Sequence, residues 1–259
     1  MNRITTLAVS AALALSPLAV TAPTYAAPAK ATYAVTAKVN TTVAVSKEDT
    51  IKVRGRVTPK ASGQKVVLQQ RVGNKKAWRA TGTATVKSNG SYVLRDDPST
   101  PGTREYRVLK PASDGIAKGF STTLAVEVYA WEKLGYRASG PMTNLTLDGA
   151  VVATEYYGAS LVSAVAGTAS SIEYTLGRKC RELRATYALT DSSATGSTGA
   201  VTVSTDGAVR ASHVLGIGTI VAEESIDISD AFRLKFDLTT SANPAAIAAV
   251  ATPEVLCTR

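Results

Sequence analysis

Few residues in this 259-residue sequence have the types and spacing needed for catalysis. His213 is the single histidine, so a Ser–His–Asp triad would have to use it, and no Gly-x-Ser-x-Gly elbow marks a nucleophile. Glycoside hydrolysis needs two facing carboxylates, but neighbours such as Glu223 and Glu224 diverge on a strand. The sequence also shows no phosphate-cradling loop and no cluster of metal ligands. We therefore expect a protein that is not an enzyme and that has no metal or other cofactor.

Five side chains near expected loops could hold a ligand rich in hydroxyl groups: Trp131, Tyr136, Tyr156, Tyr157 and Asp191. Aromatic faces stack on the apolar side of a sugar ring, and a carboxylate accepts hydrogen bonds from its hydroxyl groups. Tyr156 and Tyr157 are adjacent, so on a strand they point to opposite sides. In the alternative interpretation, Trp131 packs at a domain seam and one of the two tyrosines belongs to the core.

Residues 1–26 have the features of a secretory signal peptide. One positive charge, Arg3, precedes an apolar stretch at residues 4–20, and small residues follow. Cleavage is expected after Ala26, with Ala29 as the alternative. Pro17 interrupts the apolar stretch, whereas a membrane anchor needs about 20 unbroken apolar residues. We therefore expect a secreted, extracellular protein, either free or associated with the cell surface, that does not insert into the membrane.

Export changes the interpretation of the two cysteines. In an oxidising compartment, an even number of cysteines is typical of disulfides, so Cys180 and Cys257 are expected to pair. The alternative is two buried thiols. A bridge across 77 residues would contribute about 4–5 kcal/mol to the free energy of unfolding in the chain-entropy model.

Charge divides the chain into a basic and an acidic part. Residues 27–128 contain 18 Lys and Arg against 7 Asp and Glu, whereas residues 129–259 contain 10 against 13. This reversal predicts two separately folded domains, 27–128 and 129–259, that meet near residues 129–134.

The first part is predicted to be a β-sandwich. In residues 51–57 apolar side chains alternate with cations, as in a strand with one buried and one solvated face. About seven short strands follow one another, separated by turns such as Ser88-Asn89-Gly90, which is typical of a hairpin. The motifs VRGRVTP (53–59), VVLQQR (66–71), GSYVL (90–94) and REYRVL (104–109), with Trp78, resemble the immunoglobulin-like modules common in secreted actinobacterial proteins. The resemblance implies a spacer or adhesive module without a particular ligand.

Eight cations of this part could attract an anionic wall polymer. They are Lys52, Arg54, Arg56, Lys65, Arg71, Lys75, Lys76 and Arg79. The plainer interpretation, which we favour at this point, is that strand faces need solubilising charge and that lysines protect edge strands from aggregation. Nucleic acid is not expected as a partner, because of the predicted export and because few aromatic residues interleave with the cations.

The second part also alternates with period two, and Asp206-Gly207 between two alternating runs is the strongest hairpin signal of the chain. In residues 232–238, Phe232, Leu234, Phe236 and Leu238 share one face. Eight or so strands in about 130 residues predict a jelly-roll β-sandwich, so the whole protein is expected to be all-β, with two β-sandwich domains.

The order of segments in this part resembles the NPCBM carbohydrate-binding domain of the galactose-binding-like jelly-roll superfamily. The resemblance is carried by WEKL (131–134), SIEYTLGRKCREL (171–183), ATYALTDSS (185–193), VTVSTDGAVRASHVL (201–215) and SIDISDAFRLKFDL (225–238). It implies that the chain binds a glycan or cell-wall polysaccharide. Members often carry a His where Gly167 and Thr168 stand, and an acidic, Trp-containing run where residues 248–252 stand. These departures favour the alternative, a structural or protein-binding surface protein whose sugar site is lost, whereas the ordered match over the whole domain favours glycan binding, which is our leading prediction.

Overall fold

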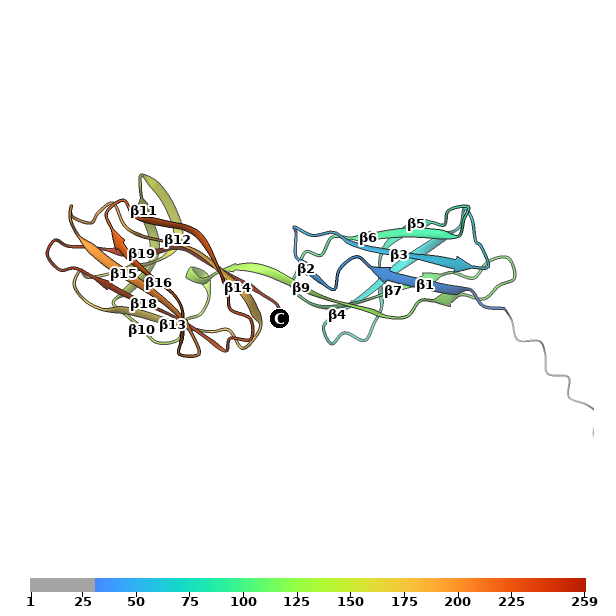
Figure 1. Ribbon diagram of the computed structural model, residues 1–259. Helices are drawn as coiled ribbons and strands as arrows, with labels where there is room; N and C mark the ends of the chain where they lie inside the picture. Colours follow the sequence, from blue (N-terminus) through green and yellow to red (C-terminus); the bar gives the residue numbers. More distant parts are fainter. Residues whose placement is uncertain (1–30) are drawn as a thin grey trace, which may run out of the picture.

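The computed structural model describes residues 31–259, so the expected signal peptide in residues 1–26 lies outside the described residues. This part of the chain consists of β-strands, turns and one short 3-10 helix, η1 (Leu134–Tyr136), and contains no α-helix (Figure 1). The prediction of an all-β, sandwich-like protein is thus confirmed. Within residues 31–259, we find no helix with the length and hydropathy of a membrane-spanning segment.

Nine strands surround the first hydrophobic core. They are β1 (Ala34–Val39), β2 (Val43–Val45), β3 (Ile51–Thr58), β4 (Lys65–Val72), β5 (Arg79–Thr85), β6 (Ser91–Asp96), β7 (Gly102–Lys110), β8 (Gly119–Phe120) and β9 (Leu124–Lys133). One sheet has the order β1-β3-β6, and the strands β9-β7-β4-β5 belong to the other, with β2 on β9 and β8 on β7. Alternate residues such as Ile51, Val53, Leu68 and Tyr106 are buried between the sheets, as period-two burial requires.

Ten strands surround the second core. They are β10 (Met142–Thr143), β11 (Leu145–Val152), β12 (Glu155–Ser163), β13 (Ser170–Thr175), β14 (Cys180–Leu189), β15 (Thr198–Thr205), β16 (Ala208–Gly216), β17 (Ile220–Asp227), β18 (Arg233–Thr240) and β19 (Ala248–Cys257). One sheet has the order β10-β13-β18-β15-β16, and β11, β12, β19, β14 and β17 neighbour one another in the second. Leu234, Phe236 and Leu238 are buried as expected, whereas Phe232 is 41% exposed. The predicted hairpin at Asp206-Gly207 joins β15 and β16 and is confirmed.

Strand β9 runs from one core to the other (Figure 1). Its first half pairs with β7, where Val128 lies opposite Gly102, and its second half pairs with β19, where Lys133 lies opposite Glu254. The buried clusters on either side share no residue. The expected boundary between residues 128 and 129 therefore falls inside one continuous strand, and a single hydrogen-bonded sheet connects the two cores.

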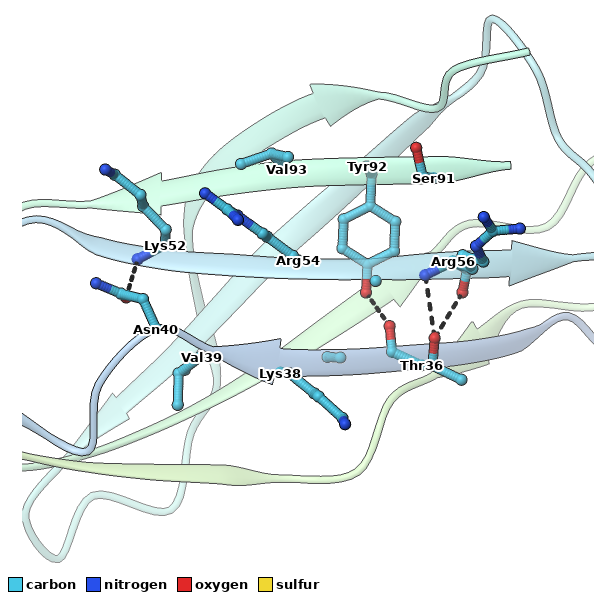
Figure 2. Close-up of a pocket in the computed structure, with 12 residues that line it drawn as sticks. Thr36, Lys38, Val39, Asn40, Lys52, Arg54, Arg56, Ser91, Tyr92 and Val93 are labelled. Carbon is cyan, nitrogen blue, oxygen red and sulfur yellow. Dashed lines mark hydrogen bonds between the residues drawn. The ribbon is translucent and has the colours of Figure 1, made fainter. Parts of the chain in front are cut away.

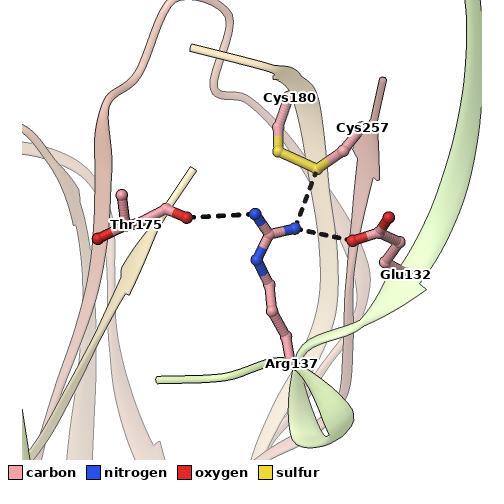
Figure 3. A network of polar contacts seen from close by, with 5 residues as sticks. All are labelled: Glu132, Arg137, Thr175, Cys180 and Cys257. Atoms are coloured by element: carbon pink, nitrogen blue, oxygen red, sulfur yellow. Dashed lines mark hydrogen bonds and ion pairs between the residues drawn. A yellow bond between two sulfur atoms is a disulfide. The ribbon is translucent and has the colours of Figure 1, made fainter. Parts of the chain in front are cut away.

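The predicted disulfide between Cys180 and Cys257 is present, and the two residues lie directly opposite each other on β14 and β19. Arg137, just after η1, lies beside it (Figure 3). Its Nη1 donates to Glu132 Oε2 at 2.7 Å and lies 3.8 Å from Cys257 Sγ, while Nη2 donates to Thr175 O at 3.2 Å. This network ties the start of the second core to both of its sheets.

The turn at Ser88-Asn89-Gly90 is present, but it does not close a hairpin. Strand β5 before it pairs with β4, whereas β6 after it pairs with β3 in the opposite sheet. The expected hairpin is therefore wrong, since the chain crosses here between the two layers of the first sandwich.

Candidate functional site

A polar groove crosses four neighbouring strands of the second core, β12, β19, β14 and β17. Its volume is about 260 Å³. We call it the bulged groove; its lining residues are Tyr157, Arg184, Ala185, Thr186, Glu223, Ala251, Thr252 and Glu254. Each of the four strands contributes at least one polar side chain, so the groove is a property of the whole sheet face.

The backbone at the bulged groove is irregular on three strands at once. Ala159, Glu223 and Thr252 have φ values of 56°, 46° and 41°, and they are the non-glycine residues inside strands of the described chain with positive φ. The pairing register of β14 also breaks on both sides, next to Ala185. A positive φ is a genuine outlier for a β-branched residue such as Thr252. Bulges of this kind re-aim side chains and are common beside functional sites.

Buried hydroxyl groups hold these bulges in place. Ser160 is fully buried, and its Oγ accepts a hydrogen bond from Thr252 N at 3.1 Å. The hydroxyl of Thr186, 5% exposed, accepts from Glu223 N at 3.0 Å. Thr252 Oγ1 in turn donates to Gly158 O at 3.0 Å. The displaced amides of Glu223 and Thr252 and the carbonyl of Gly158 thus find side-chain partners, as buried backbone groups require.

The side chains of the bulged groove combine hydrogen-bond donors, acceptors and an aromatic surface. Arg184 forms an ion pair with Glu254 at 2.6 Å, and its guanidinium lies 3.9 Å from the ring centroid of Trp131. Tyr157 Oη donates to Glu155 Oε2 at 3.1 Å, and desolvation together with the Glu155 and Glu223 carboxylates raises the pKa of Tyr157. Within residues 31–259, the carboxylate of Glu223 accepts no hydrogen bond.

Such an arrangement suits the recognition of hydroxyl groups. Carboxylates accept hydrogen bonds, the guanidinium donates them, and a tyrosine hydroxyl does both. The guanidinium of Arg184 also lies against the ring of Trp131 on β9, which fixes its position at the groove.

One of the five candidate ligand-binding residues, Tyr157, lines the bulged groove. Trp131 contacts Arg184 but lines a separate hollow, together with Ala130 and Glu132. Tyr136, on η1, and Tyr156, on β12, are 80% and 69% exposed and are not among the lining residues.

The fifth candidate, Asp191, stabilises a turn. Its carboxylate oxygens accept hydrogen bonds from the backbone amides of Ala153 at 2.7 Å and Thr154 at 2.8 Å. These two residues form the turn between β11 and β12, and both have positive φ. Asp191 thereby holds a turn that lacks the glycine or asparagine usual at such positions.

Sequence reasoning did not find Arg184, Thr186, Thr252 and Glu254, and Glu223 was considered only as a candidate acid. Their proximity follows from the register of β14 with β19 and β17, which no local pattern specifies. A cue was present in the sequence of β19, which contains Pro253, because proline inside a strand is largely confined to edges and bulges.

His213 is half-buried, stacks on Tyr187 with ring centroids 5.2 Å apart, and contacts Glu224 through Nε2 at 2.9 Å. In the described part of the chain, no group of three or more His, Cys, Asp or Glu side chains could hold a metal ion. Searches of protein-family models and of curated proteins find no match for this chain.

Proposed function

We propose that this chain is a secreted, non-catalytic carbohydrate-binding protein that holds one residue of a neutral glycan in the bulged groove. The observation that carries the proposal is that two left-handed residues inside strands, Glu223 and Thr252, and the register break of β14 all occur at one polar groove. Strained non-glycine conformations persist only where the surroundings enforce them, and they concentrate at ligand sites. Here buried Ser160 and Thr186 enforce them.

Charge selects the class of sugar. Glu223 and Glu254 supply two carboxylates, and Arg184, which is bound to Glu254, supplies one cation. The groove therefore carries an excess negative charge that repels uronic and sialic acids. A neutral pyranose can donate hydroxyl hydrogens to Glu223 and accept from Arg184, with the ring of Tyr157 as the aromatic surface of the groove.

The arrangement of the sheets supports a finer assignment of the two cores. We propose that the first core is an immunoglobulin-like spacer module and the second a galactose-binding-like jelly roll. Each core lies between two sheets that are antiparallel apart from the parallel pair β2–β9, and the segments that resemble the jelly-roll family follow one another in order from the end of β9 through β13 to β18.

A glycan array followed by calorimetry on the mature chain tests the proposed function. The array contains galactosides, N-acetylhexosamines and wall fragments, and binding to a neutral glycan is expected. Tyr157→Phe should weaken binding about fivefold through one lost hydrogen bond. The matched variant Tyr156→Phe removes the neighbouring exposed hydroxyl and should bind like the wild type.

Arg184→Lys provides a second test, because it keeps the charge but loses the planar group stacked on Trp131. We expect at least about a tenfold loss of affinity. Silence across the whole array, or equal losses for the two tyrosine variants, would contradict the proposal. Silence would favour the rival function, a structural or protein-binding surface protein without a sugar site.

A further inference from the structure

A second hollow lies on the first core, on the face formed by β1, β3 and β6 (Figure 2). Its volume is about 630 Å³, and four cationic side chains line it: Lys38, Lys52, Arg54 and Arg56. We call this surface the basic face. Its lining contains no acidic residue.

The cations of the basic face have no internal partners. Among residues 31–259, no ion pair, side-chain hydrogen bond or ring contact involves the ends of these four side chains. Cations on the opposite sheet are different, since Arg71 pairs with Glu105 and both Arg71 and Arg107 stack on Trp78. On that sheet an aromatic ring therefore lies between cations, although the sequence showed few aromatic residues among them.

Cations also face each other across the strands of the basic face. Lys38 lies directly opposite Arg54, and Lys52 lies directly opposite the exposed Arg95. Like charges in such cross-strand pairs destabilise a sheet. Protection of edge strands accounts for Lys38 on β1 and Arg95 on β6, but not for Lys52, Arg54 and Arg56 on the central strand β3.

Local contacts fix the backbone that presents these cations (Figure 2). Asn40 Oδ1 accepts from Lys52 N at 2.6 Å, and Thr36 Oγ1 accepts from Arg56 N at 3.0 Å. Between them, Tyr92 reaches across Gly55 to donate its hydroxyl hydrogen to Thr36 O. The row of cations on β3 is therefore held on a rigid sheet.

We propose that the basic face binds an extended polyol-phosphate polymer, a chain of phosphodiester-linked sugar alcohols. Alternate residues of β3 place cations at intervals of about 6.6 Å along one line, which suits a single extended chain with regularly spaced anions. Arginine forks match phosphate oxygens. The lining offers no exposed aromatic ring on which nucleic-acid bases could stack, because Tyr92 is 1% exposed. Because the protein is expected to be exported, the ligands available to it are such polymers rather than nucleic acids.

Binding of the mature chain to synthetic poly(glycerol phosphate) across a salt series tests this inference. We expect affinity to fall steeply with salt, since counterions are released from the polymer. The triple variant Lys52→Gln/Arg54→Gln/Arg56→Gln should lose at least about tenfold in affinity. The control Lys75→Gln/Lys76→Gln/Lys87→Gln changes the net charge equally at exposed positions outside the basic face and should stay within about twofold of wild type.

Folding of the triple variant is checked by its thermal midpoint, which should be equal to or above that of the wild type at low salt because like-charge pairs are removed. Equal losses for both triple variants would overturn the proposal in favour of diffuse attraction. Preference for single-stranded DNA over the polymer, or no binding at low salt, would also overturn it. The outcome is independent of the bulged groove, whose neutral ligand should bind the triple variant unchanged at high salt.

Discussion

Removal of the Cys180–Cys257 disulfide should destabilise the second core far more than the first. The bridge joins residues 77 apart in sequence. In the chain-entropy model a closed loop of this length lowers the entropy of the unfolded chain by about 15 cal/mol/K, or about 4.5 kcal/mol at 25 °C. Both sulfurs are buried beside β9, where strand pairing with β19 remains when the bridge is absent.

Urea unfolding of Cys180→Ala/Cys257→Ala, followed by fluorescence, measures this loss. Trp131 lies at the second core and Trp78 at the first, so a Trp78→Phe background isolates the relevant signal. For a slope of about 2 kcal/mol/M, the midpoint should fall by about 2 M. Reduction of the wild-type bridge serves as a control that removes no side-chain volume. A loss below about 1 kcal/mol in both experiments would refute the reasoning.

Two further predictions concern packing and pH. A methyl group at Gly55 would lie 1.7 Å from Thr36 O and 2.5 Å from Tyr92 Oη, so Gly55→Ala should cost about 2–3 kcal/mol, measured by urea unfolding; an unchanged midpoint would contradict this packing. Hydrogen bonds from two backbone amides lower the pKa of Asp206. The ionised carboxylate therefore stabilises the folded state above the ordinary carboxyl pKa, and this stabilisation is lost as the pH falls through the lowered pKa of Asp206. Asp206→Asn should therefore lower the thermal midpoint at neutral pH, and the difference from the wild-type midpoint should disappear in acid. The midpoint of Asp230→Asn should follow that of the wild type at every pH. A difference between Asp206→Asn and the wild type that is constant with pH would count against this account.

Features specified by neighbouring residues were predictable from the sequence. Alternation at residues 51–57 predicts β3, and Asp206-Gly207 predicts the β15–β16 hairpin, because side-chain burial and turn geometry are set locally. The disulfide followed from the number of cysteines and the expected compartment.

Features that depend on distant contacts were not predictable. The β11–β12 hairpin was missed because its turn uses Ala153 and Thr154, which are not turn residues, and depends on Asp191, more than 30 residues away. The turn at Ser88-Asn89-Gly90 was recognised, but no local signal says whether the strands beside a turn pair or separate into two sheets. The change of net charge near residue 129 suggested a domain boundary there, so the continuity of β9 across both cores was not expected.

The candidate site was predictable only in part. Trp131 and Tyr157 were chosen because exposed aromatic rings bind sugars; Tyr157 lines the bulged groove, whereas Trp131 only contacts its Arg184. Arg184 and Glu254, which complete it, meet through the pairing of β14 with β19 and carry no signal of their own. The left-handed conformation of Thr252 is held by the buried Ser160 hydroxyl and the Gly158 carbonyl on β12 and has no signature in the sequence.

The central claim, that the bulged groove holds a neutral sugar, is tested most directly by a backbone amide NMR titration of the mature chain at high salt. With the neutral glycan that binds most tightly, the amide signals of Ala185, Glu223 and Thr252 should shift together and saturate with one dissociation constant. Shifts confined to other parts of the surface, or unchanged signals from these three amides under saturating glycan, would contradict it.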